Sequence, residues 1–315
     1  MLNFIKRFKI SYAIYNFFHR KELLHNEIQY KKLGLSKKYY SSISSKDFEG
    51  LPGSNSEIPS IDDSILSTSK LYHTLSSSSK ESLLNYSENG FAVLEKYLSE
   101  EQVDSINQEI ETMLKNGTVK FTNVNKIMFA IHKSTLLRET GNNKDLIELL
   151  SLLMGDEAIL FQSINFIMGS EQDTHSDSIH MTTYPLGGLL GVWIALEDIT
   201  LENGPLHYYP KSHKLPYYMN KDYDNEGTTF MLGDKSYTAY ETMMSNKIKE
   251  HQLEKINFCA KKGDLLIWHA NLLHGGNEHL NKNKTRKSMV FHYFKKDSIC
   301  YHEITQRPAL IKYSE

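Results

Sequence analysis

Apolar residues recur in ordered patterns from about residue 84 onward. A turn sequence at 89–90 (NG) precedes a run, FAVLEKY, whose composition is typical of a strand. Ser99 with Gln102 three residues later is the signature of a helix capping box, and apolar residues then follow at helical spacing. The predicted elements are a strand at 91–97, a helix from about 99 to 116, and a second helix at 145–154 that ends before Gly155.

After Gly155 the pattern changes to short runs rich in Ile, Val, Phe and Tyr, separated by Gly, Pro and Asn. Such runs are typical of strands. They lie at 158–168, 191–199, 206–210, 264–269 and 287–294. Strands at this density behind leading helices predict a mainly β fold with flanking helices, as a β-sandwich or a jelly roll. We expect this domain to span residues 84–315.

Two segments of different composition precede the domain. Residues 1–40 carry nine Lys and Arg against two Glu, together with many aromatic residues. They predict a basic amphipathic arm, which either packs on the domain or lies on an anionic lipid surface. Residues 41–80 contain fourteen serines, and we interpret 41–83 as a linker, either a loop or an extended wrapping segment.

Bulk composition excludes some classes of protein. The 315 residues have a net charge of −2, so no overall basic field indicates nucleic acid binding. The only cysteines, Cys259 and Cys300, form no CxxC pair and favour a reducing, cytoplasmic location, with peripheral membrane contact through residues 1–40 left open. No run reaches the roughly 18 apolar residues of a membrane span, and the N-terminus lacks the pattern of a signal peptide.

The candidate chemistry lies at two places. His175 and Asp177 form an HxD motif and would share one face of a strand that follows residue 168, while His274 precedes two glycines about a hundred residues later. Two histidines and a carboxylate are the facial triad of non-haem Fe(II) oxygenases, which leaves open metal positions for a co-substrate and O2. We therefore expect His175, Asp177 and His274 to bind Fe(II) and to form the catalytic centre.

Arg286 lies twelve residues beyond His274, and Ser288 follows two residues later. We expect the intervening loop to make an antiparallel return, so that Arg286 and Ser288 face the metal site. A guanidinium can hold a carboxylate with two hydrogen bonds, which suits 2-oxoglutarate, and Ser288 can add a hydroxyl. Gln162 and Asn165, on the preceding strand, are further candidate contacts to 2-oxoglutarate or substrate.

Other polar residues receive a structural interpretation. A single histidine is more often on the surface or in the core than at a metal. For Lys126 and Lys133 we expect solvent-exposed side chains, and the alternative is that they reach the mouth of the cavity. The histidines interpreted in this way are His180, His207, His213, His251, His269, His279 and His292. Residues 215–258 form a long polar insert, expected to be either a lid over the site or a surface excursion with its own small core.

Residues 192–214, VWIALEDITLENGPLHYYPKSHK, resemble the phytanoyl-CoA dioxygenase family, and residues 89–110 look like the start of that family's domain. The resemblance covers about 84–296 and departs at Lys211, where the family usually has Gly. It implies a double-stranded β-helix, Fe(II) held by His175, Asp177 and His274, and 2-oxoglutarate held by Arg286. The family includes halogenases that lack the carboxylate, so Asp177 favours hydroxylation.

The resemblance implies oxidation of a C–H bond with decarboxylation of 2-oxoglutarate to succinate. Its members act on varied substrates, so we expect a small-molecule or lipid-like substrate without further definition. The basic residues near position 286 do not by themselves indicate a CoA site. A non-catalytic jelly-roll binding module is the alternative that the sequence leaves open.

Overall fold

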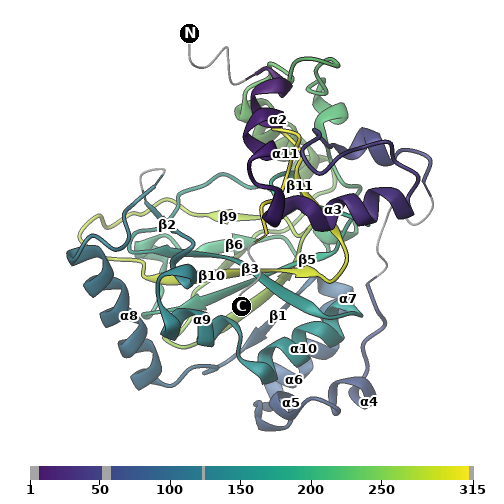
Figure 1. The fold of residues 1–315 in the computed structure, drawn as a ribbon. Helices are drawn as coiled ribbons and strands as arrows, with labels where there is room; N and C mark the ends of the chain where they lie inside the picture. The colour runs from purple at the N-terminus through teal and green to yellow at the C-terminus, as the bar shows by residue number, and fades with distance from the viewer. Residues whose placement is uncertain (1–6, 52–57, 123–124, 312–315) are drawn as a thin grey trace.

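The computed structural model describes residues 7–51, 58–122 and 125–311, and its strands form a jelly roll with helices packed outside (Figure 1). The main sheet has the order β1-β8-β5-β10-β3-β2, and two three-stranded sheets, β7-β6-β9 and β12-β11-β4, complete the strands. All of the pairings are antiparallel. The strands are β1 Phe91–Leu94, β2 Lys126–Met128, β3 Ala158–Phe166, β4 Thr182–Tyr184, β5 Leu189–Ala195, β6 Leu206–Tyr208, β7 Ile256–Phe258, β8 Leu265–His269, β9 His274–Gly276, β10 Ser288–Lys295, β11 Ile299–His302 and β12 Arg307–Pro308.

The helices gather in two groups. Figure 1 shows α8, α9 and α10 against one side of the main sheet, with α2, α3 and α11 together at the opposite end of the molecule. The α-helices are α2 Lys9–Phe17, α3 Arg20–Lys32, α4 Asp63–Leu66, α5 Lys70–Thr74, α6 Ser77–Leu84, α7 Tyr86–Asn89, α8 Glu100–Lys115, α9 Thr135–Gly141, α10 Lys144–Met154 and α11 Tyr237–Glu250. None of the helices in the described ranges is long and apolar enough to cross a membrane.

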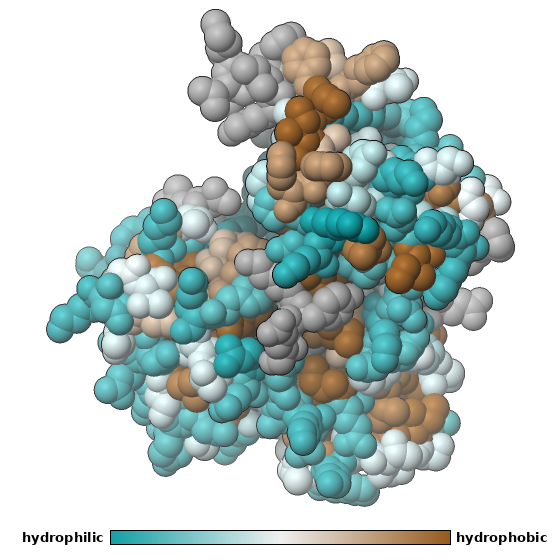
Figure 2. Space-filling model, in the orientation of Figure 1, coloured by the Kyte–Doolittle hydropathy of each residue, from teal (hydrophilic) through white to brown (hydrophobic). Residues whose placement is uncertain are grey.

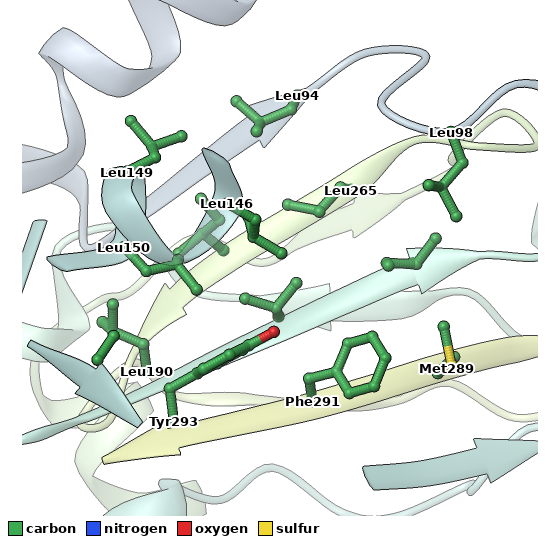
Figure 3. Packing of buried hydrophobic residues seen from close by; sticks show 14 of the residues in the cluster. Leu94, Leu98, Leu146, Leu149, Leu150, Leu190, Leu265, Met289, Phe291 and Tyr293 are labelled. Carbon is green, nitrogen blue, oxygen red and sulfur yellow. The ribbon is translucent and has the colours of Figure 1, made fainter. Parts of the chain in front are cut away.

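Alternation along β10 separates the core from the site. Phe291 and Tyr293 pack with leucines of α10, including Leu146 and Leu150, in the main hydrophobic cluster (Figure 3). Successive residues of a strand point to opposite faces, so His292 faces the interior of the jelly roll instead. The main sheet therefore has one face covered by helices and one face available for chemistry.

The strands and the two helices predicted from periodicity are confirmed, with ends shifted by a few residues. Ser99 accepts from the backbone N–H of Gln102, and the Gln102 side chain accepts from the N–H of Ser99, so the predicted capping box is present. One face of α8 buries the apolar residues Val103, Ile106, Ile110 and Met113. The apolar residues predicted to share one side of this helix therefore all face the core.

The prediction of loop or extended structure for the serine-rich segment is wrong over much of its length. Three short helices, α4, α5 and α6, occupy 63–84, and the side chains of Asp62 and Ser76 cap two of them. Leu66, Tyr72 and Leu83 are buried in the main cluster. Serine favours helix N-caps as well as loops, so a serine-rich segment can form short helices. A few apolar residues on each helix are then enough to pack it on the main hydrophobic cluster.

The insert at 215–258 contains helix α11, and its apolar side chains share a small hydrophobic core with residues outside the insert, so it does not have the separate core that one of the two expectations described. Tyr240 and Met244 of α11 pack there with Ile179, Tyr209 and Leu273. The same helix also contributes Tyr237 and Glu241 to the wall of the large cavity. The insert is therefore both a packed unit and part of the cavity wall.

Candidate active site

A short backbone bridge brings the two halves of the predicted triad together. The N–H of His175 donates to the carbonyl of His274, and the N–H of His274 donates to the carbonyl of His175, both at 2.9 Å. Asp177 begins a single 3₁₀ turn, Asp177–Ile179, which the hydroxyl of Ser176 caps. The expectation that HxD lies on a regular strand is therefore wrong, but the bridge and the turn still place both side chains in the interior.

The three side chains converge on one point. The carboxylate Oδ1 of Asp177 is 3.9 Å from Nε2 of His175 and 3.8 Å from Nε2 of His274. Their candidate ligand atoms all lie within 4.8 Å of one another, and all three residues are buried. This spacing, with two imidazoles and one carboxylate on one side of an open space, could hold a divalent metal ion.

Hydrogen bonds orient each of these groups. Nδ1 of His175 donates to the carbonyl of Asp173 at 2.8 Å, and Nδ1 of His274 donates to the carbonyl of Leu272 at 2.9 Å. Both imidazoles therefore carry their proton on Nδ1 and turn the Nε2 lone pair toward the site. The indole N–H of Trp268 donates to Oδ2 of Asp177 at 2.8 Å, which leaves Oδ1 directed toward the histidines. These supporting contacts are the kind that fix metal ligands.

The electrostatics favour the metal-binding protonation states. Burial alone would raise the pKa of the Asp177 carboxyl, but His274, His292 and His175 outweigh it and lower that pKa below its usual range. Burial, with His274 nearby, lowers the pKa of His175 well below its ordinary value. At neutral pH the carboxylate is ionised and the His175 imidazole is neutral, as metal binding requires.

Arg286 is a buried cation without a carboxylate partner among the described residues. Its Nη1 donates to the hydroxyl of Ser288 at 2.9 Å, and its Nε has no hydrogen-bond partner. The guanidinium carbon lies 5.4 Å from the Phe166 ring centroid and 5.8 Å from that of Trp193. Burial lowers the pKa of Arg286 to about 10, so it stays charged at neutral pH. A buried unpaired charge is costly, so this arrangement fits an anionic ligand.

A cavity of about 850 Å³ connects the two groups. Its lining includes His175, Asp177, His274 and Arg286. Its volume is in the range of small-molecule sites and leaves room beyond the metal-binding end. The structure therefore brings the predicted triad and the predicted arginine together around one space.

The other residues predicted near the site, Gln162, Asn165 and Ser288, differ in whether they line the cavity. Gln162 lines the cavity, whereas Asn165 is fully buried on the other face of β3, so the prediction that Asn165 contacts 2-oxoglutarate or substrate is wrong. Ser288 is also fully buried and is not among the residues that line the cavity. It accepts the hydrogen bond from Arg286, so its hydroxyl orients the guanidinium.

Several cavity residues were not predicted. His180 and His292, which were interpreted as surface or core histidines, both line the cavity, and Nε2 of His292 is 3.6 Å from Oδ2 of Asp177. The solvated interpretation of Lys126 is also wrong, because this side chain lines the cavity and donates to Oε1 of Gln172 at 2.9 Å. Lys133 is exposed, as expected. Strand alternation points to Lys126 on β2 and His292 on β10, whereas His180 directly follows the 3₁₀ turn Asp177–Ile179 and lies on no strand.

The fold and the site together define a jelly roll of the non-haem iron oxygenase type. The sequence profile of the family described as phytanoyl-CoA dioxygenase (PhyH) matches residues 86–288. The chain therefore belongs to the phytanoyl-CoA dioxygenase family, whose members are Fe(II)- and 2-oxoglutarate-dependent oxygenases.

Individual relatives are distant. The chain is 26% identical over 174 residues to phytanoyl-CoA dioxygenase domain-containing protein 1 of Bos taurus, covering 54% of this chain and 56% of that protein. It is 28% identical over 183 residues to phytanoyl-CoA dioxygenase of Arabidopsis thaliana, covering 56% of this chain and 59% of that protein. The chain thus spans a little over half the length of these curated relatives.

Solved structures support the fold. The non-heme alpha ketoglutarate dependent carbocyclase SnoK from nogalamycin biosynthesis superposes with a TM-score of 0.62 at 18% identity, over 78% of this chain and 96% of that one. EctD from S. alaskensis with 2-oxoglutarate and 5-hydroxyectoine gives a TM-score of 0.55 at 17% identity, over 75% of this chain and 84% of that one.

Proposed function

We propose that this protein is an Fe(II)- and 2-oxoglutarate-dependent dioxygenase that hydroxylates an unactivated C–H bond of a small-molecule or lipid-like substrate, with decarboxylation of 2-oxoglutarate to succinate. The observation that carries the proposal is the position of the His175, Asp177 and His274 ligand atoms on one wall of the cavity that Arg286 also lines. Family membership supports the same reaction class.

His175, Asp177 and His274 would hold Fe(II), because their donor set and protonation states fit this ion. When bound, Fe(II) supplies the activation of O2 and 2-oxoglutarate that oxidises a substrate C–H bond. The protein orients the ligands through Trp268 and the two backbone carbonyls, and it keeps bulk water out by burial.

Arg286 would bind the distal carboxylate of 2-oxoglutarate. Its Nε is free to donate, and the Phe166 and Trp193 rings hold the guanidinium plane in a water-poor environment. A charge-assisted pair is stronger there than at the surface. An anion at this position would also pair with a buried charge that has no ion-pair partner in the described part of the chain, where Glu197 acts on it only from a distance.

The rest of the cavity is suited to an organic substrate. Apolar side chains of Phe161, Ile164 and Phe294 line it from β3 and β10. A polar group of the substrate would meet His180, whose Nε2 is hydrogen-bonded to the hydroxyl of Tyr237 at 2.8 Å. This mixture supports a largely apolar substrate with at least one polar group.

The test is succinate formation from 2-oxoglutarate with Fe(II), O2 and ascorbate, first without substrate and then with candidate small molecules and lipids. We expect slow succinate formation in wild type, stimulation by the true substrate, and a product that gains one oxygen atom. Asp177→Ala should lower hydroxylation by at least about a hundredfold, which corresponds to about 3 kcal/mol of transition-state stabilisation.

The control variant is His251→Ala, which changes an exposed histidine outside the site and should behave as wild type. Wild-type-like hydroxylation by Asp177→Ala would exclude the proposed centre, and absence of turnover by the iron-loaded wild type would favour the binding-module alternative.

A further inference from the structure

Helix α2 turns its apolar face away from the protein. Ile10, Ile14, Phe17 and Phe18 share one face by helical spacing, and their exposed fractions are 64, 56, 55 and 78%. The residue of α2 that is buried is the polar Asn16, whose side-chain amide donates to the carbonyl of Tyr40 at 3.4 Å. Figure 2 shows hydrophobic side chains gathered over α2 on this side of the molecule. A surface helix normally buries its apolar face, so this inverted orientation indicates a partner.

Helix α3, which follows α2 in the chain, also has exposed apolar residues and adds positive charge. Leu24 and Ile28 are 40 and 57% exposed. Lys21, Lys31 and Lys32 are also exposed, and their spacing places them on the same side of α3 as the two apolar residues. Exposed apolar residues beside lysines are typical of helices that lie at a lipid–water interface.

We propose that α2 and α3, the interfacial arm, dock the protein on an anionic lipid surface. The arm lies within a segment of nine basic and two acidic residues, whereas the whole chain has 36 basic and 38 acidic residues. On α3, apolar insertion and attraction to anionic lipid therefore act on the same side of the helix. A second copy of the chain fits less well, because a symmetric interface would set the lysines of one arm against those of the other.

The inner side of the same helix belongs to the cavity. Tyr15 and Asn16 line the space that also contains His175, and the guanidinium of Arg307, another lining residue, stacks over the Tyr12 ring at 4.9 Å. Docking through the outer face of α2 would therefore hold the cavity next to the lipid surface. This last step rests on the proposed function and narrows its substrate class to lipid-like molecules that partition into a membrane.

Vesicle co-sedimentation tests the docking directly. The full chain is mixed with phosphatidylcholine vesicles that do or do not contain phosphatidylserine, without iron or 2-oxoglutarate. We expect binding to the anionic vesicles that weakens with added salt. Phe18→Asp and Ile14→Asp should each reduce the vesicle association constant by about tenfold or more, since each removes an inserted apolar side chain.

The matched control is Leu280→Asp, because Leu280 is 67% exposed but lies outside the arm. This variant should bind vesicles as wild type does. Equal vesicle binding by Phe18→Asp and Leu280→Asp would overturn the proposal, as would absence of binding by wild type. Self-association of wild type that Phe18→Asp abolishes, without vesicle binding, would assign the face to a second copy. Because the readout needs neither iron nor 2-oxoglutarate, its failure would leave the succinate assay as an independent test of the proposed function.

Discussion

At the scale of single residues, Trp268 is the side chain that holds the Asp177 carboxylate in place. Its indole N–H donates to Oδ2 at 2.8 Å, and both residues are buried. Trp268→Phe keeps an aromatic ring but removes this donor, so we expect Fe(II) affinity to fall about 10- to 100-fold. Anaerobic Fe(II) titration of the folded variant measures the change. Unaltered affinity would show that the other contacts of Asp177, including His292, fix the carboxylate without Trp268.

Arg286 offers a second test at this scale. Arg286→Ala removes the buried cation, so the KM for 2-oxoglutarate should rise by about 30- to 100-fold, equivalent to about 2–3 kcal/mol for a charge-assisted pair. Fe(II) affinity should remain, because Arg286 contributes no metal ligand. Arg286→Lys should recover only part of the loss, since an ammonium cannot form the two-pronged contact. Loss of Fe(II) binding in Arg286→Ala would instead give the residue a structural role.

The sequence predicted the cluster of His175, Asp177 and His274 and the nearby Arg286 better than the side chains that support them. His175, Asp177, His274 and Arg286 belong to motifs whose residue types and spacing indicate a function. Trp268 belongs to no such motif, because its role depends on a contact across 91 positions of the chain. Contacts of this kind follow from strand pairing and cannot be read from a local pattern.

At the scale of elements, the pairing of β5 with β8 makes room for Trp268. Gly191 lies opposite Trp268 in this pair, and a Cβ added at Gly191 would approach Cε2 of the indole to 2.2 Å. We expect Gly191→Ala to displace the indole, to weaken Fe(II) binding through Asp177, and to destabilise the fold by about 1–3 kcal/mol. Metal titration and urea unfolding measure the two effects. Wild-type values in both would mean that the sheet adapts to the methyl group.

The predicted elements differ from the observed ones for identifiable reasons. The strands β3, β5, β8 and β10 have dense apolar runs, so periodicity was sufficient to place them. Helix α11 has a polar sequence and buries only Tyr240 and Met244, so the insert resembled a loop. The short helices at 63–84 are stabilised mainly by their docking on the main core. Local propensity is a weak guide where tertiary packing decides the structure.

At the scale of the whole molecule, the arrangement of the sheets corrects one prediction. The segment between His274 and Arg286 was expected to form an antiparallel hairpin. Instead, β9 pairs with β6 in a small sheet, while β10 lies in the main sheet between β5 and β3. The segment crosses from one sheet of the jelly roll to another, so His274 and Arg286 approach the cavity from different sheets.

Buried neutral histidines predict how the stability of the metal-free protein depends on pH. Burial lowers the pKa of His269 to about 3 and those of His207 and His302 to about 4. Between pH 6.5 and 4 the unfolded chain binds more protons at these sites than the folded chain, so stability must fall as pH falls. His269 alone would contribute on the order of 3 kcal/mol by pH 4.

Urea unfolding across this pH range measures the effect. The free energy of unfolding should decrease steadily from pH 6.5 to pH 4, and His269→Gln should show a shallower decrease because Gln does not titrate. An identical slope in the variant and in wild type would show that His269 is not held neutral by the fold.

The most direct test of the account is anaerobic addition of Fe(II) and 2-oxoglutarate to the metal-free protein, followed by visible absorption. A charge-transfer band appears only when 2-oxoglutarate chelates Fe(II) at one centre. We predict this band in wild type, its loss in His274→Ala, and its retention in His251→Ala. If folded wild type shows no band, or if His274→Ala shows the same band as wild type, the site described here is not the iron and 2-oxoglutarate centre.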